Sequence, residues 1–165
     1  MDQNGLKILR AELQGDMEIL STLESKYEAI HRKLDAIVPD EFDYAALAYT
    51  IVNIYNLMEN YFHRVAKRFE NNLDDREWHR DLVKRMALEI EDVRPAVIQK
   101  REIPIFDELR SFRHVFRHIY MGELDRNKLL SVDARLSDAI DIFRKNHQKF
   151  STYIDDLIRI ESGSF

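Results

Sequence analysis

The chain has 165 residues, a formal net charge of −5 and no cysteine. The lack of cysteine excludes disulfides and thiolate-based metal or redox chemistry. Because the molecule as a whole is acidic, any contact with RNA must come from a local basic patch. Only four glycines and three prolines leave little room for a turn-rich β fold. The length suits one domain with a substantial core, so we expect residues 1–165 to form a single all-α domain.

The first ten residues, Met1 to Arg10, lack the apolar stretch of a signal peptide. No run in the sequence approaches the ~20 apolar residues that a membrane span requires. These features favour a cytoplasmic protein that makes no contact with a membrane.

Residues 2–38 are predicted to form one long helix, because apolar residues alternate at spacings of three and four and only Asp16 breaks the series. Such a seam is typical of a core helix in a bundle, and it also permits pairing with a partner helix. The seam consists of Leu6, Leu9, Leu13, Leu20, Leu23, Tyr27, Ile30, Leu34 and Ile37.

A second helix is predicted over about 43–71, after Pro39, with Asp40 or Asp43 as its cap. Its expected buried stripe is Leu47, Ile51, Ile54, Tyr55, Met58, Phe62, Val65 and Phe69. Glu59 and His63 are four residues apart on this helix. We interpret them as a surface ion pair or a satisfied histidine rather than as metal ligands.

Three further helices follow in the sequence. One is expected over about 76–91, capped at Asp75 after a turn and with Trp78, Leu82, Met86 and Ile90 facing inward. A connector over 92–101 leads to a helix that has Pro104 near its start and ends around Tyr120, with Gly122 beyond it. The last spans about 127–160, with the stripe Leu129, Val132, Leu136, Ile140, Phe143, Phe150, Tyr153, Leu157 and Ile160. Together these elements predict an antiparallel bundle of about five helices.

The stretch 113–120 is the part of the chain that suggests chemistry. On an ideal helix one apolar arc contains Leu109, Phe112, Val115, Phe116 and Ile119, and the opposite basic face contains Arg110, Arg113, His114 and Arg117. Arg113 and His118 are five residues apart, so their side chains diverge by about 140°. To act on one substrate, the two residues need a bent helix end or a second copy of the chain.

We considered a metal site here, since His114 and His118 are four residues apart. The stretch lacks the glutamate that follows the first histidine in zinc peptidases, and the neighbouring arginines repel a cation, so we expect no metal. RNA cleavage requires none. The 2′-hydroxyl is an internal nucleophile, histidine can transfer protons, and arginine can hold phosphate through two hydrogen bonds. A solvated basic helix face, paired with acidic residues elsewhere in the chain, is the plainer interpretation.

The series Arg-x4-His-x-Tyr, formed by Arg113, His118 and Tyr120, resembles the signature of HEPN-domain proteins, specifically the HepT-like ribonuclease toxins. His114 fits a polar position of that signature, and Asn56-Leu57-Met58-Glu59-Asn60-Tyr61-Phe62 looks like the family's second helix. The resemblance covers roughly residues 40–155.

The resemblance implies a metal-independent endoribonuclease that uses no cofactor and forms a homodimer, with Arg113 and His118 as catalytic residues from two protomers in one cleft. His114 would support them, and Arg110 and Arg117 would contact the phosphates of the RNA substrate. Between the arginine and the histidine, the family more commonly has the residues Asn-x-x-Val. This chain departs from that pattern with Phe116 and Arg117.

The resemblance also implies a regulatory partner. In HepT-like toxins the tyrosine of the motif, here Tyr120, accepts AMP from a nucleotidyltransferase antitoxin. The plainer interpretation of Tyr120 is an amphipathic residue that seals the helix end. Two function classes stay open: an endoribonuclease of a toxin–antitoxin pair, and a non-catalytic HEPN-like helical module that binds nucleotide, RNA or a partner protein.

Overall fold

The computed structural model describes residues 2–70, 78–119 and 122–161, except for the side chains of 78–80. Within these residues the chain forms five α-helices and one turn of 3₁₀ helix, without a β-strand, which confirms the all-α prediction. The elements are α1 (Gln3–Ala36), α2 (Glu41–Glu70), α3 (Trp78–Met86), η1 (Lys100–Glu102), α4 (Ile103–Arg117) and α5 (Arg126–Glu161). No helix in this part of the chain is long and apolar enough to span a membrane.

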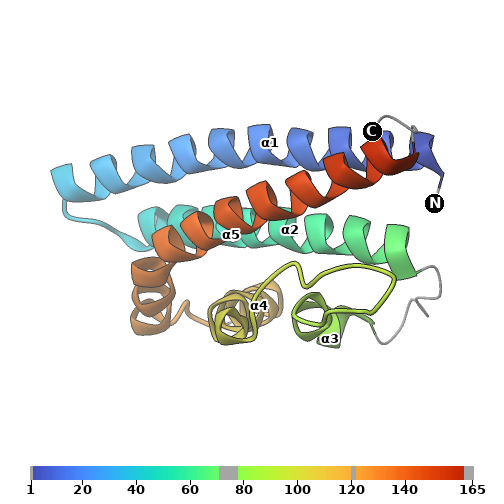
Figure 1. The fold of residues 1–165 in the computed structure, drawn as a ribbon. Coiled ribbons are helices and arrows are strands. Elements are labelled where there is room, and N and C mark those ends of the chain that lie inside the picture. Colours follow the sequence, from blue (N-terminus) through green and yellow to red (C-terminus); the bar gives the residue numbers. More distant parts are fainter. Residues whose placement is uncertain (1, 71–77, 120–121, 162–165) are drawn as a thin grey trace.

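Helices α2 and α5 lie in the middle of the molecule, between α1 and the pair formed by α3 and α4 (Figure 1). Helix α1 packs against α2 and α5, whereas α4 packs against α2, α5 and α3. In Figure 1, α1 therefore lies on one side of α2 and α5, and α3 and α4 lie on the other. The start of α1 meets the end of α5, where the Gln3 amide donates to the carbonyl of Ile158 at 3.4 Å.

Helix α1 begins at Asp2, whose carboxylate accepts hydrogen bonds from the backbone of Asn4 and Gly5. Its seam is buried from Leu6 to Leu20 and partly buried from Leu23 to Leu34, as expected for a core helix. The last seam residue, Ile37, is instead 44% exposed, at the C-cap of α1. Asp16 is also buried, and it pairs with Arg64 of α2 at 3.2 Å. Burial nevertheless raises the pKa of the Asp16 carboxyl, so the charged residue inside the seam carries a desolvation cost.

Helix α2 begins after a reciprocal cap. The Asp40 carboxylate accepts from the backbone of Phe42 and Asp43, and the Asp43 carboxylate accepts from the backbone of Asp40. The expected stripe of α2 is confirmed, since all eight of its residues are buried. Its aromatic residues pack edge-to-face with α4 and α5, and Phe62 contacts Phe106 and Phe143.

The prediction for the third helix was too long at its C-terminal end, because α3 ends at Met86 rather than near 91. The carbonyl of Met86 accepts from the backbone of Val97 and Ile98, which turns the chain back. The buried guanidinium of Arg94 pairs with Glu70 at 2.6 Å and donates to three main-chain carbonyls. The buried side chain of Arg94 thus attaches the segment after α3 to α2. This attachment explains why α3 does not continue to residue 91.

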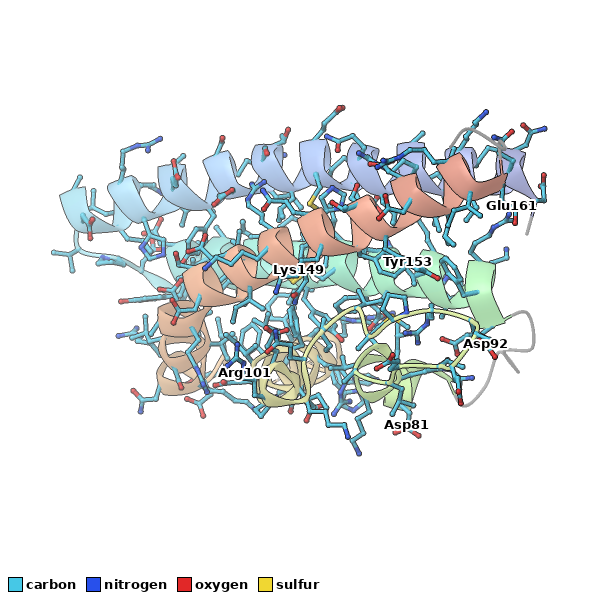
Figure 2. The ribbon with its side chains drawn as sticks, in the orientation of Figure 1. Asp81, Asp92, Arg101, Lys149, Tyr153 and Glu161 are labelled. Carbon is cyan, nitrogen blue, oxygen red and sulfur yellow. The ribbon has the colours of Figure 1, made fainter. Side chains whose placement is uncertain are left out.

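Tyr153 of α5 also holds the connecting segment, because its hydroxyl donates to the carbonyl of Val93 at 3.3 Å. Figure 2 labels Tyr153 on α5 and Asp92, the residue before Val93, in this segment. Most of the α5 stripe is buried as predicted, but Ile160 is exposed near the helix end. Ile90, expected to face inward, is half-buried in the connecting segment. The predicted turn at 71–75 and the side chain of Trp78 lie outside the described residues.

Candidate functional site on helix α4

Helix α4 ends three residues earlier than expected, at Arg117, and the reason lies in His118. The backbone N–H of His118 bonds to the carbonyl of Val115, as in a tightened last turn. The carbonyl of His114, which a continuing α-helix would pair with that N–H, instead lies 2.7 Å from Nδ1 of the His118 ring. The His118 side chain therefore caps the helix with its own ring.

This cap determines which nitrogen of His118 is available for chemistry. A carbonyl oxygen can only accept, so Nδ1 must carry the proton that it donates to His114. In the neutral ring, Nε2 then has a free lone pair. His118 is exposed, and the ring of His114 lies beside it with centroids 4.5 Å apart. The end of α4 thus presents two imidazoles, one of which is oriented by the backbone.

Arg113 lies elsewhere than predicted. Its guanidinium points toward α2, where Nη1 is 2.5 Å from Oε2 of Glu59, and only 15% of its side chain is exposed. The guanidinium carbon also lies 5.7 Å from the ring centroid of Tyr55, which is a cation–π distance. The basic face was expected to lie toward solvent or a partner, whereas Arg113 is mostly buried against α2 and pairs with an acidic residue there.

Arg110 joins the same cluster between α2 and α4. Its Nε donates to Asp107 at 2.7 Å, and this bond raises the pKa of Arg110. The buried hydroxyl of Tyr55 has a raised pKa, first because of burial and then because of the charge of Glu59. Tyr55 consequently stays neutral and serves as a packing surface for the guanidinium. We name Tyr55, Glu59, Asp107, Arg110 and Arg113 the α2–α4 cluster.

The predicted basic face is therefore largely neutralised. Glu59 and Asp107 each pair with an arginine of α4, and Arg117 and His114 are exposed. Val115, assigned to the buried arc, is 42% exposed. The structure brings His114 and His118 together and places Arg110 and Arg113 in the cluster, but it records no contact between Arg113 and His118 among the described residues.

Sequence reasoning missed Glu59, Asp107 and Tyr55 as members of the site. A signal for Glu59 existed, because it follows Tyr55 by four residues and so lies on the buried side of α2. A carboxylate in such a position needs a cationic partner from another helix. Glu59 was instead interpreted together with His63 as a surface ion pair or a satisfied histidine. The surface position was wrong, because Glu59 is 8% exposed and pairs with Arg113 of α4.

No group of three or more metal-ligating side chains occurs in the residues that the structure describes. Tyr120, the predicted site of modification, lies outside those residues.

A comparison with protein-family models matches residues 46–154 to the HepT-like protein family. No curated protein and no solved structure matches the chain. The matched range begins in α2, includes the whole of α4 and ends in α5, so it contains the α2–α4 cluster and both histidines. The chain belongs to the HepT-like protein family.

Proposed function

We propose that this protein is a metal-independent endoribonuclease, the toxin of a toxin–antitoxin pair. The observation that carries the proposal is the cap at the end of α4, where the His114 carbonyl orients His118 so that Nε2 faces outward as a proton acceptor. Membership of the HepT-like family supports it. Cleavage of RNA needs such an acceptor near the phosphate and no metal ion.

In the proposed reaction, Nε2 of His118 takes the proton of a ribose 2′-hydroxyl. The 2′-oxygen attacks the adjacent phosphorus, the bond from phosphorus to the 5′-oxygen breaks, and a 2′,3′-cyclic phosphate forms. The leaving 5′-oxygen needs a proton, and the neighbouring imidazole of His114 is a suitable donor when it is charged. Arg113 holds the phosphate through its exposed edge, and Arg110 and Arg117 contact the flanking phosphates.

A homodimer is part of the proposal. Arg113 points toward α2 whereas His118 caps the free end of α4, so one protomer does not direct both at one phosphate. A two-fold axis near α4 can bring Arg113 of one protomer toward His118 of its partner. The 42% exposure of Val115, next to His114, leaves an apolar side chain that a second copy would cover.

We expect dimers in solution that bring the two α4 ends together. Multi-angle light scattering at micromolar concentration should give twice the mass of one 165-residue chain. Val115→Asp should shift the equilibrium to monomers and reduce RNA cleavage in parallel, because it places a charge in the interface. Leu88→Asp, at an exposed leucine after α3, is the matched control and should change neither. A monomeric wild type with full activity would contradict the shared cleft.

The second candidate function is a non-catalytic module that binds nucleotide, RNA or a partner protein. The ion pair between Arg113 and Glu59 favours it, because a paired arginine is a weaker ligand for phosphate. Incubation of the purified protein with RNA in EDTA separates the two functions. Cleavage that is lost in Arg113→Ala and His118→Ala supports the nuclease, and binding without cleavage supports the module.

Neutralisation is proposed to act through Tyr120. A nucleotidyltransferase antitoxin would add AMP to its hydroxyl, and the new phosphodiester would occupy the positions that RNA phosphates need. We expect Tyr120→Phe to retain most RNase activity and to escape inhibition by that partner in the presence of ATP. Mass spectrometry of the co-expressed wild type should find adenylate on the peptide that contains Tyr120. A fully inhibited complex with unmodified Tyr120 would point to occlusion instead.

A further inference from the structure

A polar cleft of about 420 Å³ lies between α1 and α5. Helix α1 packs on the side of α2 and α5 that is opposite to α4, so this cleft is separate from the α2–α4 cluster (Figure 1). Its volume falls within the range of small-molecule sites. Most of the side chains that line it are polar, among them Arg10, Arg144, His147 and Ser151.

The first observation is a buried hydroxyl that no partner satisfies. Ser151 is only 6% exposed, and its Oγ forms no hydrogen bond with any group in the described chain. Other helical hydroxyls here, including that of the next residue Thr152, donate to the carbonyl four residues earlier. A buried polar group without a partner is costly, and the residue that carries this one is among those that line the cleft.

The second observation is the orientation of His147, which is 8% exposed. Its Nδ1 lies 3.1 Å from the hydroxyl of Tyr61, which is buried in the core under α5. Tyr61 can donate this bond, and the proton of a neutral His147 ring then sits on Nε2, at the opposite edge. Burial and the charges of Arg10 and Arg144 lower the pKa of His147, so the ring is neutral near pH 7 and offers Nε2–H as a donor.

The third observation is the charge around the cleft. The hydrogen bond from Arg10 to Asp155 uses Nε, which leaves the donors on its two terminal nitrogens. Arg144 pairs with Glu24 and donates to Ser21 through Nη2. Each arginine is thus paired with one carboxylate, and the charges of both arginines still reach His147, where they contribute to its lowered pKa. Asp155, which pairs with Arg10, also lines the cleft and is 44% exposed.

We propose that this cleft binds the phosphate group of a small phosphorylated molecule. Ser151 Oγ and His147 Nε2 donate to the phosphate oxygens from the floor, and Arg10 and Arg144 donate from the two sides. All four groups are donors, which suits an acceptor-only ligand. The cleft is larger than a phosphate ion alone, so the rest of the molecule would extend past Gln14 and Gln148 toward solvent. This proposal does not depend on ribonuclease activity.

The test is an NMR titration of the full chain with inorganic phosphate and with glycerol 3-phosphate. We expect a dissociation constant of about 1 mM or lower, with shifts at Ser151 and at Nε2 of His147. Ser151→Ala should keep the fold, because it removes an unpaired buried hydroxyl, and should weaken binding about fivefold. Arg10→Gln should weaken it about tenfold or more, since a charged hydrogen bond is lost.

Two control variants on α1 match these changes outside the cleft. Ser25→Ala removes a hydroxyl that bonds within its own helix, and Arg32→Gln removes an exposed arginine. Both should leave the affinity unchanged. Tighter binding of glycerol 3-phosphate than of inorganic phosphate supports an organic phosphate, and equal binding supports free phosphate as the ligand. Absence of binding by either probe overturns the proposal, as does binding that neither Ser151→Ala nor Arg10→Gln weakens.

Discussion

Replacing His118 with alanine is expected to reduce RNA cleavage by roughly 100- to 10,000-fold, the usual contribution of a positioned acid or base. The affinity for RNA should change little, because the proposed role of His118 is proton transfer and the phosphate contacts come from arginines. The loss follows from the cap at the end of α4, which leaves Nε2 as the only free nitrogen of the neutral ring. Single-turnover cleavage rates and a separate RNA-binding titration measure the two effects independently.

The fold is expected to survive this change. The His118 ring provides one hydrogen bond at an exposed helix end, which stabilises the native state by about 1 kcal/mol. His118→Asn keeps an amide that can donate to the same region but cannot transfer a proton, so it should be as inactive as alanine. Wild-type rates in both variants, with native circular dichroism, would remove His118 from the mechanism.

His114→Ala distinguishes the roles of the two imidazoles. If His114 donates the proton to the leaving 5′-oxygen, the alanine variant loses activity on natural RNA but regains it on a substrate whose leaving group needs no proton. His118→Ala would stay inactive on both substrates, because the 2′-hydroxyl still requires a base.

The helices of this protein could be predicted from periodicity because their apolar residues recur over many turns. The stripe of α2 illustrates this, since every one of its eight predicted residues is buried. The residues at which helices end were harder to predict, because helix ends depend on single hydrogen bonds. Nothing in the local pattern at the end of α4 reveals that the His118 ring takes the carbonyl of His114 and stops the helix.

Charged residues inside apolar stripes are where sequence reasoning failed most. Asp16 and Glu59 both occupy buried positions, and each is paired with an arginine from another helix. Periodicity can show that such a residue faces inward, but its partner depends on how two helices are packed. Arg113 follows Leu109 by four residues, so it lies beside the buried arc. Its long aliphatic stem lets the guanidinium reach Glu59.

The pairing of Arg113 with Glu59 leads to the second large effect. Arg113→Ala is expected to reduce RNA cleavage about 100-fold or more, because an ion-paired phosphate contact is lost in the transition state. It should also lower the free energy of unfolding by about 2 kcal/mol, because the charged hydrogen bond between Arg113 and the buried Glu59 is lost. Loss of activity in this variant alone would therefore not separate chemistry from stability.

A double variant makes that separation. Arg113→Met with Glu59→Gln removes both charges and keeps similar volumes, so we expect its melting temperature to recover toward that of the wild type. Its cleavage should stay as low as that of Arg113→Ala, because no guanidinium is present. Arg113→Lys keeps a cation for Glu59 and should be stable, yet it should recover activity only partly without the two-pronged donor.

Glu59→Gln alone tests whether the acid restrains Arg113. Removing the carboxylate frees the guanidinium and adds one net positive charge to the α2–α4 cluster, so RNA affinity should rise about three- to tenfold and become more sensitive to salt. If Arg113 only stabilises the packing of α4 on α2, Glu59→Gln should bind RNA no more tightly than the wild type. In that case the Arg113→Met, Glu59→Gln protein would cleave like the wild type, and the guanidinium would belong to the fold rather than to the reaction.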